Sequence, residues 1–549
     1  MTGLLDVEGQ GTAPPRRTVA IIPASAKHRY PELLRALEEA YTVRFVGSTA
    51  GGVDSVDAVI VFPGGDVPEA PGVPRLVLRE PEAERRSPFT VELSRCPSLD
   101  RALHGQRLLE ADAGPPAPVA LDPGWRSLAM ADGKPIWARN EADGMDHEIA
   151  SALPVELEDH EFLRDHLTAG RFWSLLPVVH FLKRISWGAS ATANAHSACF
   201  VIDDPNLRFS TYGCVSFADL ARDARESGYH VALAAIPLDL LLPGRGAVSV
   251  VQAFGAELSL AVHGNDHVKR ELERHRSADE ADRLILSADA RVRRFEERTG
   301  IRVERVMCPP HGGCSHETLA ALFRCGFFGL AASRPFPWDG FADQRRWRLG
   351  GWLPAQLAGG GLPVLPRYHL SRSLDDLVFR AFREQPLIVY CHHEDLCDGL
   401  EPLRAAAARV AELGDATWMS LASIARRNAL HREQDGLSTV ALYSRDLRIP
   451  RPEAPIVRVE IPRTLGAGDR VRLVVDGVGH EVRTDPDGSA AITLSNRHEQ
   501  APFRAQISAL SRPANATSRD WRPRAWPLAR RAMTETRDRA VPFVRALRR

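Results

Sequence analysis

The sequence lacks several features that would place its 549 residues in a special class of protein. Its eight cysteines are too few for a disulfide scaffold, so reduced thiols are expected. No run approaches the ~18 uninterrupted apolar residues of a membrane span, and the N-terminal residues lack the apolar core of a secretory signal. The 70 basic and 70 acidic side chains balance, which excludes a global attraction to nucleic acid. These absences predict a cytoplasmic protein.

What is present is ordinary globular composition, with 44% hydrophobic and 26% charged residues. At roughly 150 residues per domain, the length predicts three or four domains. Residues 1–17 are polar and contain Gly and Pro, and we expect them to be disordered. We therefore expect a multidomain α/β protein, on the strand and helix patterns that follow.

The first predicted domain covers residues 18–116. A buried-strand run at 18–23 is followed by a helical pattern at 31–40 and by strands at 41–46 and 58–62. This order predicts an open α/β sheet of the flavodoxin or glutamine amidotransferase type. Its Pro63-Gly64-Gly65 turn resembles the sheet edge of class I glutamine amidotransferases, but Cys96 is not at a strand-to-helix elbow. A structural or recognition role is expected.

Three further regions follow. Residues 117–194 are predicted to be a helical connector. Residues 195–430 alternate apolar runs with amphipathic helices, which indicates a barrel or a doubly wound sheet. Short period-two runs separated by Gly and Asp-Gly turns predict a small β-sandwich at 450–512.

Four short motifs follow predicted strands in the 195–430 region. They are Asp203-Asp204, His263 with His267, the turn at residues 308–312, and His392-His393. Two adjacent carboxylates after a buried strand need compensating partners. Histidines four residues apart on a helical turn point the same way, as ligands of one metal must. A rigid Pro-containing turn can aim backbone N–H groups at an oxyanion.

Together the motifs indicate a metal-dependent hydrolase. One Asp and two His leave positions open on a divalent metal, and Zn²⁺ at such a site activates water and polarises a carbonyl. A second carboxylate then serves as base, and a further His as acid for the leaving group.

The arrangement resembles the polysaccharide deacetylases, carbohydrate esterase family 4, which have the NodB-like fold. The resemblance covers about residues 195–427 and implies a distorted (β/α)7 deacetylase barrel. It implies Asp203 as general base, with Asp204, His263 and His267 as ligands of Zn²⁺ or another divalent metal. It also implies His392 as general acid and the backbone N–H of His311 as an oxyanion donor.

The sequence departs from this family at several positions. Cys308 stands where the family has an Arg that holds the catalytic Asp, so another residue must supply that support. The family's Asp and Trp motif has a loose match in Asp343 and Trp347, with which Asp339 competes. Arg367 and Tyr368 could line a sugar cleft or anchor a loop, and they are taken with Trp347 as candidate substrate-binding residues.

The expected function is N-deacetylation of an N-acetylated amino sugar in a polysaccharide, oligosaccharide or glycan precursor. One alternative keeps the metal and hydrolyses a non-sugar C–N amide. Another is a catalytically decayed carbohydrate-binding protein, although the base, acid and ligand positions are all retained. The partner is a carbohydrate, with no nucleic acid.

The C-terminal segment, residues 516–549, is rich in arginine. Ten arginines and three carboxylates give it a charge of +7, so the rest of the chain carries −7. It is expected to be solvated or docked on the acidic remainder, and peripheral contact with an anionic membrane is the alternative.

Overall fold

The protein is described by a computed structural model. The residues described are 16–53, 55–68, 72–82, 87–140, 146–187, 196–338, 347–465, 470–485, 488–496, 501–508, 522 and 525–548. The disordered N-terminus expected at residues 1–17 falls almost entirely outside this set. Within the described residues, no helix combines the length and hydrophobicity that crossing a bilayer requires.

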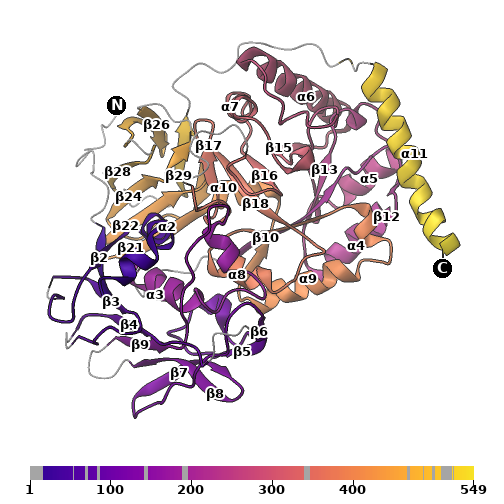
Figure 1. Ribbon diagram of the computed structural model, residues 1–549. Coiled ribbons are helices and arrows are strands. Elements are labelled where there is room, and N and C mark those ends of the chain that lie inside the picture. The colour runs from indigo at the N-terminus through magenta and orange to yellow at the C-terminus, as the bar shows by residue number, and fades with distance from the viewer. Residues whose placement is uncertain are drawn as a thin grey trace.

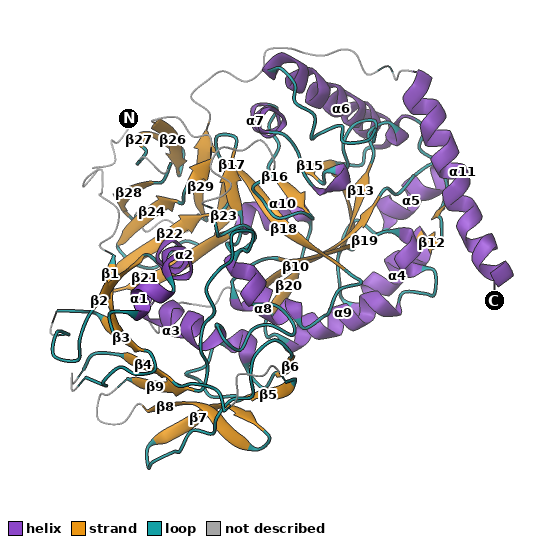
Figure 2. Ribbon diagram, viewed as in Figure 1, coloured by secondary structure: helices purple, strands orange, loops and turns teal. Residues whose placement is uncertain are grey.

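The centre of the molecule is a closed barrel of seven parallel strands (Figures 1 and 2). The strands, in order around the barrel, are β10 (His196–Asp203), β13 (Val231–Ala235), β14 (Leu258–Val262), β15 (Val303–Met307), β16 (Gly329–Ala332), β18 (Leu362–His369) and β19 (Leu387–Cys391). Pairing of β16 with β18 and of β19 with β10 closes the ring. The predicted seven-stranded barrel is confirmed.

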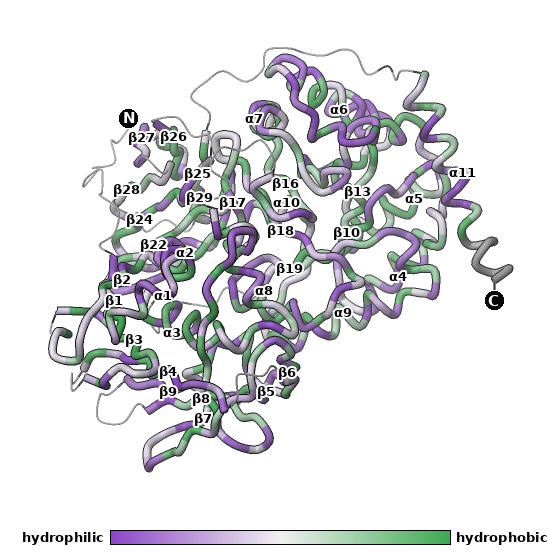
Figure 3. The backbone as a smooth tube through the Cα atoms, in the orientation of Figure 1, coloured by the Kyte–Doolittle hydropathy of each residue, from purple (hydrophilic) through white to green (hydrophobic). Residues whose placement is uncertain are grey.

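Amphipathic helices cover the barrel because its strands are apolar on both faces. The helices are α4 (Phe217–Ser227), α5 (Arg245–Ala253), α6 (Ala278–Thr299), α7 (His316–Arg324), α8 (Asp376–Phe382), α9 (Glu401–Glu412) and α10 (Leu421–Arg427). In α6, residues such as Ile285, Val292 and Phe295 form the buried stripe, and hydrophilic and hydrophobic positions alternate along it in Figure 3. A capping box of Ser277 and Glu280 begins this helix.

A nine-stranded mixed sheet forms the N-terminal part of the protein, with the order β2-β1-β3-β4-β9-β8-β7-β5-β6. Its strands are β1 (Arg17–Ile22), β2 (Val43–Gly47), β3 (Ala58–Val61), β4 (Arg75–Leu78), β5 (Phe89–Leu93), β6 (Arg107–Glu110), β7 (Trp125–Ala131), β8 (Lys134–Asn140) and β9 (His147–Ala150). The first four strands are parallel and pack against α1 (Ala26–Arg29) and α2 (Pro31–Tyr41), the open-sheet pattern expected.

The interpretation of residues 117–194 as a helical connector is wrong for its first half. Strands β7, β8 and β9 lie there, and β9 pairs with both β4 and β8. Among the described residues of this region, 117–140 and 146–187, the one long helix is α3 (Leu176–Trp187). It attaches the N-terminal sheet to the barrel, since Lys183 Nζ donates at 2.7 Å to Asp100 from one side and to Glu384 from the other.

Two four-stranded sheets pack together after the barrel. One contains β21 (Ala429–Gln434), β22 (Leu437–Leu442), β24 (Ile456–Ile461) and β28 (Ala490–Ser495), and the other β23 (Asp446–Ile449), β26 (Arg470–Val475), β27 (Val478–Arg483) and β29 (Phe503–Ser508). The predicted sandwich exists, but it begins at β21 and not at residue 450. The short strand β25 (Thr464–Leu465) pairs with β17 (Gln356–Ala358), which joins the sandwich to the barrel sheet.

The chain ends in α11 (Ala525–Arg548). This helix runs along the side of the barrel near α4 and α5 (Figure 1). The expected Arg-rich segment is therefore helical over these residues and docked on the barrel, one of the alternatives drawn from the sequence. Residues 516–521, 523, 524 and 549 lie outside the described residues.

Candidate metal centre and active site

All four motifs lie at the carboxyl ends of barrel strands. Asp203 ends β10, His263 follows β14, residues 308–312 follow β15, and His392 follows β19. In a parallel barrel these ends share one rim, so residues far apart in sequence meet there. The sequence prediction that the motifs form one site is consistent with this arrangement.

Asp204, His263 and His267 converge on one point. Oδ1 of Asp204 lies 3.2 Å from Nε2 of His263 and 3.1 Å from Nε2 of His267. These contacts lack hydrogen-bond geometry, and Oδ1 of Asp204 is buried without a hydrogen-bond partner among the described residues. With both imidazoles neutral, their nitrogen lone pairs and the Asp204 carboxylate oxygen could bind one cation between them.

The spacing of these atoms fits a divalent transition metal. Ligands about 2.0–2.2 Å from one ion lie roughly 3 Å apart at tetrahedral or octahedral angles. Oδ1 of Asp204 has that separation from an imidazole nitrogen of each histidine, and the ligand atoms of the three residues all lie within 4.8 Å of one another. The donor set of two nitrogens and one oxygen suits Zn²⁺ and leaves further coordination positions open.

The loop that carries both histidines is not the helical turn that their spacing predicted. Residues 263–267 are irregular, and His267 has φ 54°, in the left-handed region. The buried carboxylate of Glu271 shapes the loop by accepting from the backbone N–H groups of Asn265, Asp266 and His267 at 2.7, 3.0 and 3.0 Å. The histidines converge because the loop curls around this carboxylate.

Arg367, a candidate substrate-binding residue, instead holds Asp203. Nη1 of Arg367 donates to Oδ1 of Asp203 at 2.6 Å, and the two side chains are only 2% and 3% exposed. Burial alone would raise the pKa of Asp203, but the Arg367 guanidinium and, to a smaller extent, His263 hold it below its usual value. The carboxylate is therefore kept ionised in a buried position, and Arg367 cannot reach a sugar from there.

The pair of Arg367 and Asp203 compensates for Cys308, which stands where an Arg was expected to hold Asp203. The thiol is fully buried, and burial raises its pKa to about 12, so it stays neutral. Arg367 comes from β18 and supplies the positive charge that Cys308 does not. The guanidinium also lies over the ring of Tyr390, with Cζ 4.3 Å from the centroid.

Three site residues have backbone conformations that side chains rarely adopt. Asp204, His267 and His311 have φ of 65°, 54° and 63°. Strained positions of this kind cost free energy and persist where the surrounding structure holds them. His311 stands in the 3-10 turn at Pro310–Gly312, and its ring centroid is 5.8 Å from that of His267. The predicted oxyanion donor thus lies beside a metal-ligand candidate.

His392 follows β19, which neighbours β10 on the side away from β13 and β14. Its backbone N–H donates to Asp395 at 2.9 Å, and its ring centroid is 6.2 Å from that of His369. Nε2 of His369 is 3.5 Å from Asp395, so an imidazole and a carboxylate accompany His392. His392 is part-exposed, as a group that exchanges protons with substrate must be.

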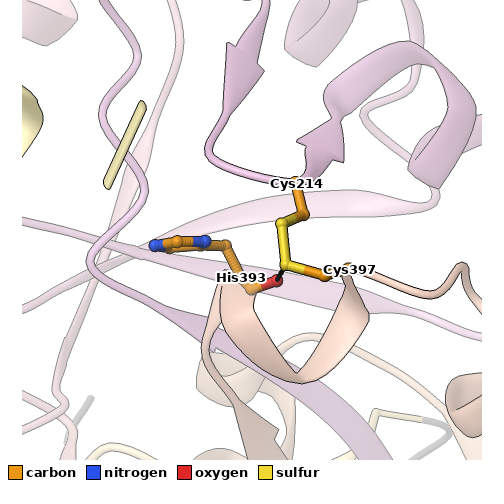
Figure 4. Close-up of side chains that lie close together, drawn as sticks. All are labelled: Cys214, His393 and Cys397. Atoms are coloured by element: carbon orange, nitrogen blue, oxygen red, sulfur yellow. Dashed lines mark hydrogen bonds between the residues drawn. A yellow bond between two sulfur atoms is a disulfide. The ribbon is translucent and has the colours of Figure 1, made fainter. Parts of the chain in front are cut away.

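Its neighbour His393 points elsewhere. The His393 side chain is 3% exposed and packs edge-on against Tyr212, and its Nε2 is 3.9 Å from Asp538 of α11. A disulfide between Cys214 and Cys397 lies next to it (Figure 4). The expectation of reduced thiols is wrong for these two residues, because a hairpin at β11 (Thr211–Tyr212) and β12 (Val215–Ser216) brings Cys214 to the loop after His392.

The other two candidate substrate-binding residues also lie inside the protein. Tyr368 is 4% exposed and donates its hydroxyl to Asp376 at 3.1 Å. Trp347 is 4% exposed and packs under Arg463. Their assignment to a sugar cleft is therefore wrong. Asp339 and Asp343, which compete for the Asp and Trp motif, lie outside the described residues.

Comparisons with known proteins were made by sequence and by structure. No family model matches the sequence, and no curated protein matches it. Among solved structures, Agd3, a carbohydrate deacetylase, is similar over 90% of this chain and 99% of its own, with 10% identity and a TM-score of 0.46. A putative polysaccharide deacetylase from Mycobacterium smegmatis is similar over 42% of this chain and 89% of its own, with 14% identity and a TM-score of 0.30.

A family 4 carbohydrate esterase from Streptomyces lividans is similar over 42% of this chain and 94% of its own, with 11% identity and a TM-score of 0.24. The barrel and the site described above rest on the strand pairings and side-chain contacts of this chain itself.

Sequence reasoning missed Glu271 and the true position of Arg367. Glu271 follows His267 by four residues, but a Glu at that distance does not by itself indicate in the sequence that it shapes the loop. Arg367 could have been found only from the pairing of β18 with β19 and of β19 with β10, which brings it beside Asp203.

Proposed function

We propose that the protein is a metal-dependent N-deacetylase that hydrolyses the acetamide of an N-acetylated amino sugar. The observation that carries the proposal is the combination of two separate carboxylates at one strand end. Asp204 faces two imidazoles and Asp203 faces Arg367. The first arrangement fits a metal ligand and the second an ionised base.

Zn²⁺ or another divalent metal held by Asp204, His263 and His267 would supply a polarised carbonyl and a water of lowered pKa. Residues of this chain carry out the remaining steps. Asp203 accepts the proton of the attacking water at its carboxylate. The backbone N–H of His311 stabilises the developing oxyanion, and His392 donates a proton to the leaving amine nitrogen.

Arg367 acts through Asp203 and is a positioning residue. A carboxylate buried to this degree would take up a proton without a cation beside it. The guanidinium keeps it charged and fixes its direction, while the neutral thiol of Cys308 fills the neighbouring space. This arrangement replaces the one that the family resemblance implied.

The alternative of a non-sugar amide substrate uses the same residues, and substrate tests separate the two. The alternative of a decayed site is disfavoured by the retained geometry. A decayed site has no reason to keep three left-handed residues and a buried ion pair around the motif positions.

The C-terminal helix bears on the proposed partners of the protein, and the cysteines bear on its proposed location. Trp526 and Met533 share one face of α11 and are 68% and 58% exposed, which favours a peripheral contact of this helix with an anionic membrane. The cytoplasmic location was predicted from the lack of an apolar signal core and of a membrane span, with reduced thiols expected there, and the pairing of Cys214 with Cys397 does not support that location. Titration with a thiol reagent in denaturant checks the pairing, with six reactive thiols expected.

The test of the function is acetate release. Purified protein, with its metal content measured, is assayed on acetylated chitooligosaccharides, galactosamine oligomers and small acetamides. Asp203→Asn should lower the rate at least 100-fold while metal content is unchanged. Asp223→Asn, a buried carboxylate bonded to Tyr229 away from the rim, is the matched control. The proposal fails if no stoichiometric divalent metal is found, or if Asp203→Asn leaves acetate release unchanged.

A further inference from the structure

Helix α11 touches the loops that carry three of the four motifs. Arg531 donates to the backbone oxygen of Asp204 at 3.3 Å, and Arg530 donates to the backbone oxygen of His267. Farther along the helix, Asp538 lies 3.9 Å from His393. The stretch from residue 530 to residue 538 is about 12 Å long at the rise of an α-helix. The helix therefore crosses the rim from the second motif to the fourth.

Over residues 525–541, the helix face that meets the barrel is mainly polar, with Pro527 as a buried apolar residue on it. Arg531, Glu535 and Asp538 lie at i, i+4 and i+7, so they share one face. Arg531 pairs with Asp239 at 2.6 Å, where the two side chains are 8% and 6% exposed. Glu535 accepts from the side chain of Asn206 at 2.8 Å.

The opposite face of α11 carries the apolar side chains Trp526 and Met533, seven residues apart and both exposed, and Leu528 is exposed at the edge of the barrel-facing side. A helix that is a permanent part of a core buries its apolar stripe. Over residues 525–541 the described contacts of this helix with the barrel include ion pairs and hydrogen bonds, and undocking returns both partners of each contact to water, which offsets the loss of the contact. This kind of attachment allows α11 to dissociate from the barrel surface.

While docked, α11 restricts the metal-ligand set. The side chains of Asp204 and His267 are each 17% exposed, and that of Asp203 is 3% exposed. A glycan chain that passes across the rim would have to run where Arg531 contacts Asp204 and Glu535 contacts Asn206. A single sugar or a chain end needs less of this space.

We infer that α11 determines the size of the substrate, covering the rim against internal residues of a glycan chain and opening when its polar contacts are broken. This inference rests on the proposed deacetylase function. Arg531 and Asp239 are the residues that hold the cover in place.

The test uses the full chain with Arg531→Glu, which places two carboxylates against each other at Asp239. Met533→Glu introduces the same charge two residues later on the outward face and is the matched control. Arg531→Glu combined with Asp239→Arg restores a pair of opposite charges, so it separates undocking from misfolding.

Two readouts are measured. The first is the ratio of kcat/KM for an acetylated oligosaccharide to kcat/KM for the acetylated monosaccharide. It should rise at least tenfold in Arg531→Glu, stay unchanged in Met533→Glu, and return toward wild type in the double variant. The second, which needs no activity, is hydrogen exchange of residues 525–541 together with the rate of modification of His267 by diethyl pyrocarbonate. Both rates should rise at least tenfold in Arg531→Glu.

An unchanged ratio, or an equal loss on both substrates, would overturn the inference, because α11 would then be neutral or a part of the catalytic site. Unchanged exchange and modification rates would overturn it as well. If the wild-type protein releases acetate from none of the substrates, the proposed function has failed, and the exchange and modification rates still decide whether α11 covers the rim.

Discussion

Removal of the Arg367 guanidinium tests the central feature of the site. Arg367→Gln breaks a contact of 2.6 Å between two side chains that are 2% and 3% exposed. Breaking a buried ion pair from one side costs about 3–5 kcal/mol, because the remaining charge has no partner. If 3–4 kcal/mol of this cost falls on the charged form of Asp203 during catalysis, acetate release drops by about 100- to 1000-fold at 1.36 kcal/mol per factor of ten.

The assay compares acetate release, metal content and urea unfolding for the wild type, Arg367→Gln and Arg367→Lys. Metal content should stay at the wild-type level, because Arg367 contacts none of the proposed ligands, and Arg367→Lys should retain part of the activity. Adding Cys308→Arg to Arg367→Gln should recover at least tenfold. Deacetylation by Arg367→Gln at the wild-type rate would refute the reasoning, and a double variant no better than the single one would refute the equivalence of the two positions.

Three further results are expected. Cys214→Ser with Cys397→Ser should lower the free energy of unfolding by about 2–5 kcal/mol in urea, because the disulfide closes a loop of 183 residues. Burial lowers the pKa of His180 from 6.5 to about 3, so the unfolded chain binds a proton that the folded protein refuses, and stability is lost as pH falls from about 6.5 toward 3. His180→Phe should therefore reduce the stability lost between pH 7 and pH 5 by about 2 kcal/mol. His263→Gln should reduce bound divalent metal, measured by elemental analysis after dialysis, to about a tenth or less.

Each of these has an outcome that contradicts it. Equal unfolding midpoints with and without the two serines, under non-reducing conditions, would show that the disulfide does not form. A pH slope unchanged by His180→Phe would show that this imidazole is protonated in the folded protein. Full metal content in His263→Gln would remove His263 from the ligand set.

The barrel and the motif positions could be predicted because both follow from local patterns. Buried runs with helices between them indicate parallel strands, and polar residues after such strands lie at one rim. The N-terminal sheet was only half predicted. Strands β7 and β8 have mixed burial, and their partners are antiparallel neighbours that the parallel pattern of residues 18–62 does not indicate.

The sequence predicted which residues form the site, but it did not predict the residues that hold them in position. The side chains of His263 and His267 converge through the carboxylate of Glu271, and no helical turn is involved. The partner of Asp203 lies 164 residues away in Arg367, a contact that depends on the closure of the barrel. Contacts of this kind depend on strand order, which a single sequence does not reveal.

The pairing of β10 with β19 has a consequence for synthesis of the chain. These are the first and last strands of the barrel, and they are neighbours in it. Asp203 ends the one and His392 follows the other, so a nascent chain that has emerged as far as β18 contains Asp203, Arg367 and the three metal-ligand candidates but lacks His392. The proposed base is therefore synthesised well before the proposed acid. We expect hydrolytic activity only after β19 and the loop that carries His392 have been made.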